Sequence, residues 1–211
     1  AMGKRVVTIV SRVADFLTNH KVVNDVLTKP DGTPLLIGDV KQKINLWLAE
    51  LGGENPEGTI FAIGRDAGIP HSSGTPSDPL RLGQTIVFDF FPCEAGGGYF
   101  YDFTRTWCLG YATETVQDLY NQVKAVYQQV VEELEVEKNA GIYQDRTCEL
   151  FEVMGHQTIR QDPAIESGYV HSLGHGVGLN IHEKPWFNRK DDPSNILVPG
   201  SVFTIEPGLY Y

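Results

Sequence analysis

The sequence predicts an α+β protein made of two αβ halves of similar size. Helical patterns followed by strand-like patterns occur twice along the chain, and a glycine-rich hairpin ends the first series. The length of 211 residues allows one large domain or two small halves that share a core, and an apolar content of 41% is ordinary for a globular protein. No internal sequence repeat accompanies this order, so any duplication would be structural only.

Two helices are predicted in the first half. Residues 5–17 carry apolar side chains at helical spacing, namely Val6, Ile9, Val10, Val13, Phe16 and Leu17. A turn at residues 29–34 leads to a second helix from about Asp39. Gly52 and Gly53 can end that helix in the left-handed conformation.

Three strands are predicted next. Short apolar runs at residues 59–63 and 85–91 are typical of strands. The second run continues through an Ala-Gly-Gly-Gly turn into residues 99–107, which are rich in aromatic and β-branched side chains. The sequence therefore indicates a hairpin across the glycines.

The second half begins with the clearest helix, from about Thr115 to Glu135. Its apolar stripe consists of Val116, Leu119, Val123, Val126, Val130 and Leu134. Another helix is predicted over residues 146–160. Glycine- and proline-marked loops then separate three runs that look like strands, at residues 169–171, 177–182 and 201–206.

The net charge of −10 narrows the range of partners. It arises from 17 Lys and Arg against 27 Asp and Glu, and it repels phosphate backbones and anionic membranes, so neither nucleic acid nor a membrane is expected. The chain has no long apolar run and no N-terminal signal pattern. Cys93, Cys108 and Cys148 are widely spaced and odd in number, which suits a reducing compartment. We therefore expect a cytoplasmic protein.

Each arm of the glycine-rich hairpin carries one aspartate. If the turn centres near Ala95 and Gly96, Asp89 and Asp102 would face each other across the ladder with Cβ atoms roughly 5 Å apart. Two like charges at that distance are unfavourable, and a pair of divalent metal ions is the usual means of neutralising crowded carboxylates. The alternative is an edge hairpin whose aspartates simply reach water.

Three of the six histidines lie within twelve positions: His171, His175 and His182. Glycines at positions 174, 176 and 178 surround His175 and leave the backbone bare, as expected where a side chain must reach an ion. An isolated histidine is more often an ordinary core or surface residue than a ligand. The density of histidine and glycine here favours a ligand role for His175.

Glu206 and His71 complete the set of candidates. Glu206 ends an apolar strand in Phe203-Thr-Ile-Glu206-Pro-Gly, where an unpaired carboxylate would be costly to desolvate, so it needs a cation or strong hydrogen-bond donors. His71 lies on a loop before the first acidic strand. Its local sequence is equally compatible with an ordinary loop histidine.

The order of these motifs resembles the pita-bread metallopeptidases, which include methionine aminopeptidase, prolidase and Xaa-Pro aminopeptidase. The resemblance covers roughly residues 60–211 and rests on the two hairpin aspartates, Gly-His175-Gly-Val-Gly, His182-Glu-Lys-Pro and Thr-Ile-Glu206-Pro-Gly. It implies the pita-bread fold, with two pseudo-symmetric αβ halves and a curved, mainly antiparallel sheet covered by helices on its outer face. The pattern His171-Ser-Leu-Gly-His175 resembles the prolidase and Xaa-Pro aminopeptidase branch.

The resemblance implies a metal centre with two divalent ions. In it Asp89 would bind one ion, Asp102 would bridge both, and His175 and Glu206 would bind the other. This mixture of carboxylates and imidazole suits Mn, Co, Fe or Zn. The ions would lower the pKa of a shared water and polarise the scissile carbonyl, with Glu206 placed to move a proton.

The resemblance also implies a substrate cleft. His71 and His182 would line it and steady the tetrahedral intermediate, and His171 would be a further substrate-binding residue. The expected reaction is metal-dependent hydrolysis of N-terminal peptide bonds, of the aminopeptidase or dipeptidase type, on a peptide with proline in second position. The sequence is compatible with a homodimer and does not decide the oligomeric state.

We expect a single catalytic domain over residues 1–211, without the separate N-terminal domain that many Xaa-Pro enzymes carry. The family carries a second bridging glutamate beyond the Ile-Glu-Pro motif, so we expect the chain to be truncated at its C-terminus. The spacing between Asp89 and Asp102 is longer than is usual in the family, and the extra residues fall in the glycine turn.

Two other functions compete with this interpretation. The first is a metal-free hydrolase of the same fold, as in the creatinase branch, which should have lost the acidic ligands that are present here. The second is a non-catalytic pita-bread protein acting as a binding module, which typically has lost several ligands.

Overall fold

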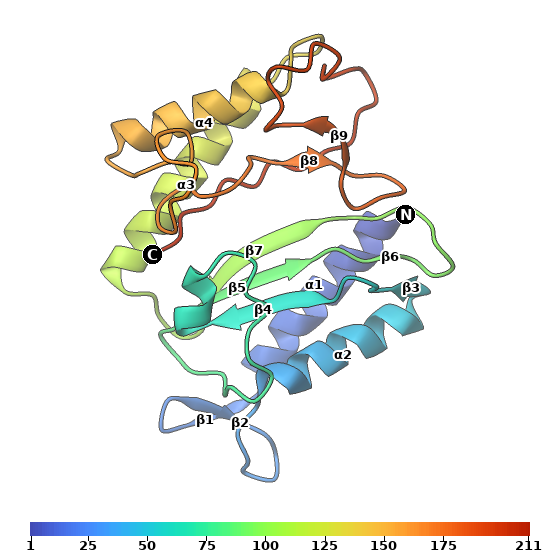
Figure 1. The fold of residues 1–211 in the computed structure, drawn as a ribbon. Helices are drawn as coiled ribbons and strands as arrows, with labels where there is room; N and C mark the ends of the chain where they lie inside the picture. The colour runs from blue at the N-terminus through green and yellow to red at the C-terminus, as the bar shows by residue number, and fades with distance from the viewer. The chain divides into compact units, whose positions relative to one another are not determined.

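The computed structural model describes residues 1–211, which form two compact units, Ala1–Thr113 and Glu114–Tyr211. Helices and antiparallel strands occur in both units (Figure 1), which confirms the α+β class predicted from the sequence. The elements of the N-terminal unit are α1 Met2–Thr18, β1 Lys21–Val23, β2 Val26–Thr28, α2 Ile37–Glu50, β3 Gly53–Glu54, β4 Thr59–Ile63, the 3₁₀ helix η1 Gly64–Gly68, β5 Thr85–Phe90, β6 Cys93–Glu94 and β7 Phe103–Cys108. Those of the C-terminal unit are α3 Glu114–Glu133, α4 Gly141–Val153, β8 His175–Gly176 and β9 Glu183–Trp186.

The helices α1 and α2 confirm the two predicted apolar stripes. The buried residues of α1 are Met2, Val6, Ile9, Val13 and Leu17, and those of α2 are Ile37, Val40, Ile44 and Leu48. The helix α2 begins two residues before the predicted start, because Asp39 Oδ2 accepts a hydrogen bond of 3.0 Å from the Leu36 N–H and so satisfies the first turn. Gly52 follows the helix with φ of +71°, the predicted left-handed conformation.

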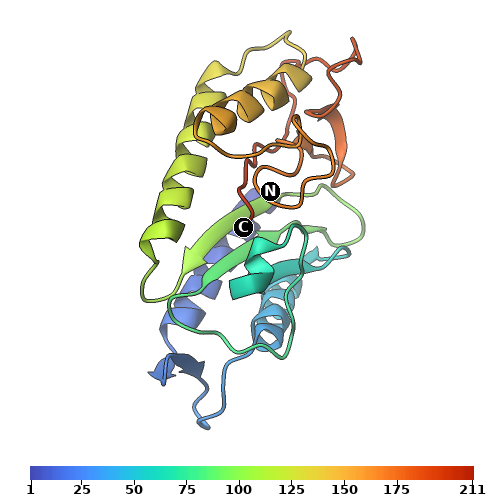
Figure 2. The same cartoon turned by 60° about the vertical axis from the view of Figure 1, so that its left-hand side comes forward.

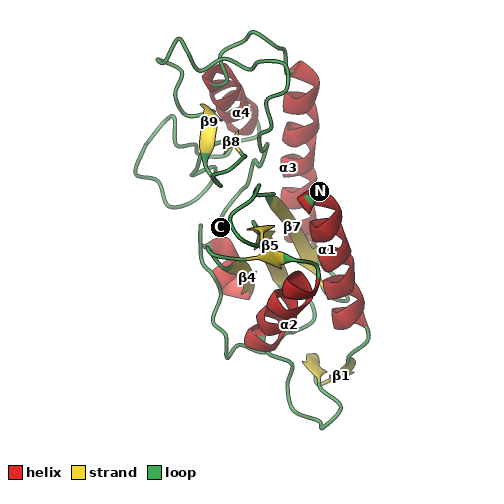
Figure 3. Ribbon diagram, turned by 90° about the vertical axis from the view of Figure 1, so that its right-hand side faces the viewer, coloured by secondary structure: helices red, strands yellow, loops and turns green.

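The main sheet of the N-terminal unit has three antiparallel strands in the order β4-β5-β7. Buried and partly exposed residues alternate along β5, so Ile86, Phe88 and Phe90 point into the core and Asp89 points to the opposite face. Figure 3 shows this sheet with both helices of the unit.

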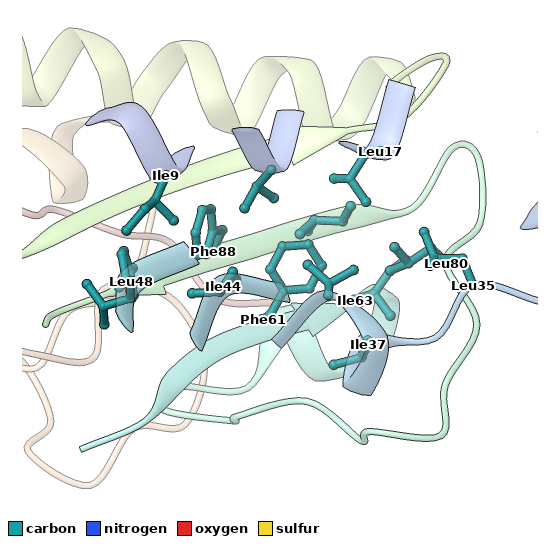
Figure 4. Packing of buried hydrophobic residues seen from close by; sticks show 14 of the residues in the cluster. Ile9, Leu17, Leu35, Ile37, Ile44, Leu48, Phe61, Ile63, Leu80 and Phe88 are labelled. Carbon is teal, nitrogen blue, oxygen red and sulfur yellow. The ribbon is translucent and has the colours of Figure 1, made fainter. Parts of the chain in front are cut away.

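The core of the N-terminal unit lies between this sheet and its two helices. Ile9 from α1 and Ile44 from α2 pack in one cluster with Phe61 and Phe88 from the sheet (Figure 4). The rings of Phe61 and Phe88 are 5.4 Å apart between centroids. Because Phe88 immediately precedes Asp89, this packing fixes the backbone from which the acidic side chain projects.

A short hairpin of β1 and β2 was not predicted. Asn24 and Asp25 form its two-residue turn with φ of +51° and +62°, as a type I′ turn requires. The strand β7 begins at Phe103 rather than at residue 99, because Gly96 and Gly97 take φ of +88° and +84° and lengthen the turn.

In the C-terminal unit, α3 confirms the helix predicted over 115–135, whereas α4 lies earlier than the predicted 146–160. Asn139 Oδ1 accepts a hydrogen bond of 2.8 Å from the Gly141 N–H at the start of α4. After its end, Gly155 has φ of +90°, which only glycine adopts readily. Figure 2 shows α3 and α4 beside the loops that follow them, and no helix in the structure is both long and apolar enough to span a membrane.

The three strands predicted after α4 are not regular strands. Only the short pair β8 and β9 is formed, with a register shift between His175 and Gly176. Irregular pairing replaces the expected ladder: the Val177 N–H donates to the Val202 carbonyl at 3.0 Å, and the Glu206 N–H donates to the Leu173 carbonyl at 2.8 Å. Residues 173–177 are thus bonded to residues 202–206 although neither segment has full strand geometry.

Candidate metal and peptide site

The structure corrects the predicted register of the two hairpin aspartates. Asp89 is paired with Thr104, not with Asp102, because the turn centres on Gly96 and Gly97 rather than on Ala95 and Gly96. The Thr104 hydroxyl donates a hydrogen bond of 2.8 Å to Asp89 Oδ1. The two carboxylates are therefore not directly opposite each other.

Asp102 precedes Thr104 by two residues, which is the side-chain period of an extended strand. The alternate residues Tyr101 and Phe103 pack against the core of α1 and α2. By this alternation, Asp102, one residue before β7, lies on the same side of the chain as Thr104, the partner of Asp89. The predicted pairing of Asp89 with Asp102 is therefore wrong.

His71 lies on the loop that follows η1, and its side chain is exposed. Its φ of +59° is in the left-handed region, which is uncommon for a residue other than glycine and concentrates at functional sites. The loop is bonded to the edge strand β4, since the Phe61 N–H donates to the Ser73 carbonyl at 3.3 Å. Gly74 packs against the Phe61 carbonyl, where a Cβ would clash.

The C-terminal unit brings His175, Glu206 and Thr204 together. His175 Nε2 lies 3.2 Å from Glu206 Oε1, and the Thr204 hydroxyl donates to the same carboxylate oxygen at 2.7 Å. The Thr204 hydroxyl oxygen accepts a bond of 3.0 Å from the His175 N–H, and the Thr204 N–H donates to the His175 carbonyl at 2.8 Å. One bond between the two backbones and one from the His175 backbone to the Thr204 hydroxyl hold His175 beside Glu206.

The orientation of the His175 ring determines what it can bind. Its Nδ1 atom lies 3.0 Å from the Gly176 carbonyl, which can only accept, so Nδ1 carries a hydrogen. In the neutral ring, Nε2 therefore carries a lone pair that points at a carboxylate oxygen. A cation must lie between the two atoms, either a proton or a metal ion.

The electrostatics of Glu206 favour its ionised form. Burial alone would raise the pKa of Glu206, but the hydrogen bonds from His175 and Thr204 outweigh burial and lower that pKa below its usual value. His171 contributes a further electrostatic lowering of the same pKa. The carboxylate is thus an anion at neutral pH.

The glycines around His175 allow neighbouring backbone segments to pack closely against it. A Cβ on Gly174 would clash with the Thr204 carbonyl, and one on Gly176 would clash with the Lys184 carbonyl. From the sequence, these glycines were expected to give a side chain access to an ion. The structure gives a different reason, because only glycine lets the neighbouring segments approach on both sides of His175.

The other two histidines of the segment have different surroundings. The exposed ring of His182 lies 4.3 Å from that of His175 between centroids, in an edge-to-face arrangement. The ring of His171 contacts those of Tyr169 and Tyr210 at 5.7 and 5.5 Å. The cluster of the C-terminal unit therefore contains every candidate that was placed there: His171, His175, His182 and Glu206.

Three residues in contact with the candidates were not singled out from the sequence. Thr104 and Thr204 each bond a candidate carboxylate, and Gln144 bonds the segment that carries His171. A threonine two residues from an acid on an extended segment shares its face, so Thr104 and Thr204 could have been found by that spacing. No such spacing identifies Gln144, because the residues that it bonds, His171 and Leu173, are 27 and 29 positions further along the chain.

The chain belongs to metallopeptidase family M24, which it matches over residues 32–211. It is 31% identical over 174 residues to an Xaa-Pro dipeptidase of Pyrococcus furiosus, covering 82% of this chain and 46% of that protein. It is 32% identical over 194 residues to a putative Xaa-Pro aminopeptidase of Mycoplasma genitalium, covering 86% of this chain and 48% of that protein.

Solved structures share the fold. The prolidase from Pyrococcus furiosus superposes with a TM-score of 0.74 at 25% identity, over 98% of this chain and 55% of that chain. The pita-bread fold expected from the sequence is therefore confirmed. The chain spans about half the length of the relatives that it matches.

Proposed function

We propose that the protein carrying residues 1–211 is a metal-dependent peptidase that hydrolyses the bond between an N-terminal residue and a proline in second position. The observation that carries the proposal is the contact between His175 Nε2 and Glu206 Oε1, in which a ring lone pair and a carboxylate require a cation between them. Membership of family M24 and the names of the relatives, Xaa-Pro dipeptidase and Xaa-Pro aminopeptidase, support this choice.

The proposed metal ligands are Asp89, Asp102, His175 and Glu206. The donor set fits a divalent ion, since it offers anionic oxygens together with a neutral imidazole whose other nitrogen is held by a backbone carbonyl. We propose two ions, with manganese among the metals that such ligands accept. When bound, divalent ions supply Lewis acidity, which lowers the pKa of water and polarises a carbonyl oxygen.

The chain's own groups then have separate tasks. The Glu206 carboxylate, ionised at neutral pH, accepts a proton from the attacking water and returns it to the leaving amine. His182, next to the proposed ligand His175, and His71 are proposed to donate hydrogen bonds to the tetrahedral oxyanion, and His171 to contact the substrate. The proposal includes a cytoplasmic location. The net charge of −10 and the odd number of cysteines, which suits a reducing compartment, are consistent with it.

The test measures how fast the purified protein hydrolyses two peptides. The peptides are identical except that one has proline and the other alanine in second position. We expect hydrolysis of the proline peptide, loss of that activity with a chelator, and its return with Mn²⁺ or Co²⁺. Hydrolysis that survives complete metal removal would contradict the proposal. An equal rate on both peptides would contradict the assigned substrate class.

A further inference from the structure

The side-chain amide of Gln144, on α4, is bonded at every position it offers. Its Oε1 atom accepts hydrogen bonds from the Leu173 N–H at 2.5 Å and from the Tyr169 hydroxyl at 3.0 Å. Its Nε2 atom donates to the His171 carbonyl at 3.3 Å and to Cys148 Sγ at 3.8 Å. Two accepted and two donated bonds are the full capacity of a glutamine side chain.

These partners fix the orientation of the amide. A backbone N–H and a carbonyl cannot exchange roles, so the contacts with Leu173 and His171 decide which end of the amide is oxygen. Leu173 and Tyr169 are fully buried, where an unpaired N–H or hydroxyl would be costly. Gln144 is therefore suited to hold residues 169–173 in one conformation.

The held segment leads directly to the candidate site. The carbonyl of Leu173 accepts the bond from the Glu206 N–H at 2.8 Å, and Gly174 separates Leu173 from His175. Leu173 is thus bonded on both sides: its N–H donates to Gln144, and its carbonyl accepts the bond from Glu206. The second contact of Gln144 is the carbonyl of His171.

We propose that Gln144 is a positioning residue of the candidate site: through the peptide groups of His171 and Leu173 it sets the placement of His171, His175 and Glu206. The proposal rests on the proposed metal function of that site. Groups that orient metal ligands without touching the metal typically contribute 10–100-fold to metal affinity or activity. Loss of Gln144 should therefore weaken metal binding and loosen one segment while the helices around it stay intact.

The experiment compares two variants with a control, in the protein that carries residues 1–211. Gln144→Met keeps the length of the side chain and removes all four bonds. Gln144→Glu keeps acceptor oxygens for the Leu173 N–H and the Tyr169 hydroxyl and loses the donation to the His171 carbonyl. Gln117→Met, at an exposed position of α3, is the matched control.

The first readout needs no metal: hydrogen exchange of single backbone amides by NMR. For Gln144→Met we expect at least about tenfold faster exchange at Leu173 and Glu206, with the amide of Val126 in α3 unchanged and Gln117→Met like wild type. Equal acceleration at Val126 would show a general loss of stability and overturn the proposal. Unchanged exchange at Leu173 and Glu206 would overturn it as well.

The second readout is calorimetric titration with Mn²⁺ or Co²⁺. The dissociation constant should rise roughly 10–100-fold in Gln144→Met and less in Gln144→Glu, which keeps the Leu173 contact. Equal affinity in Gln144→Met and wild type would contradict the positioning role. If wild type itself binds no metal, the proposed function fails, and the exchange measurement still decides whether Gln144 holds the segment.

Discussion

His175 Nε2 lies 3.2 Å from Glu206 Oε1, and the side chains that form this contact are only 12% and 31% exposed. The contact is held through Thr204, since its N–H donates to the His175 carbonyl and its hydroxyl donates to Glu206 Oε1. A nitrogen lone pair and an ionised oxygen at this distance are stable only around a cation. A proton on His175 or a metal ion bound by both groups meets this requirement, and the proposed function assigns the metal ion.

The cluster predicts a division of roles among the histidines. His175→Ala should lower the amount of bound metal, because it removes a ligand. His71→Ala and His182→Ala should keep metal and lose turnover by roughly 10²–10³, the usual effect of removing an oxyanion donor. Elemental analysis and steady-state rates on the same preparations check this. Full metal occupancy in His175→Ala would refute the assignment.

Thr204 is predicted to support the site through its hydroxyl. Thr204→Val keeps the shape of the side chain but removes the donor to Glu206 and the acceptor for the His175 N–H. Metal affinity should fall roughly 10–100-fold, as for other groups that orient ligands. Thr204→Ser retains the hydroxyl and should stay near wild type. Identical affinities of the valine and serine variants would show that the hydroxyl is irrelevant.

His156 should make stability depend on pH. Its Nε2 lies 2.7 Å from Gln122 Oε1 and its Nδ1 2.5 Å from the Tyr211 hydroxyl, and burial lowers the pKa of His156 below its usual value of 6.5. The unfolded chain therefore binds a proton more readily, so stability is lost as pH falls below about 6.5 toward the lower folded pKa. Thermal midpoints from pH 8 to pH 5 should drop further in wild type than in His156→Gln. Parallel curves would contradict this.

The helices were the most predictable part of the fold. The stripes of α1, α2 and α3 repeat the helical period over several turns, so their faces could be assigned from the sequence. The start of α4 could not be assigned from the sequence, because it is defined by the bond between Asn139 and Gly141 and not by an apolar stripe. The three strands predicted after α4 failed because Gly174 and Gly176 allow close packing of backbones without regular pairing.

The candidate site was predictable in composition and less so in geometry. Asp89 and Asp102 were assigned to one hairpin, but their register depended on where four turn residues bend the chain, and the bend falls at Gly96 and Gly97. His175 and Glu206 were both named from their motifs. Their direct contact depends on pairing between distant segments, which a sequence pattern does not specify.

Metal content and peptide hydrolysis in Asp102→Ala decide whether these acids and histidines hold catalytic metal. The substrate is a peptide with proline in second position. Glu135→Ala, which removes an exposed acid with side-chain exposure of 69%, is the matched control. We predict that Asp102→Ala loses both metal and activity, because Asp102 is assigned to both ions, and that Glu135→Ala retains both. Equal metal content and equal activity in Asp102→Ala and wild type would contradict the claim.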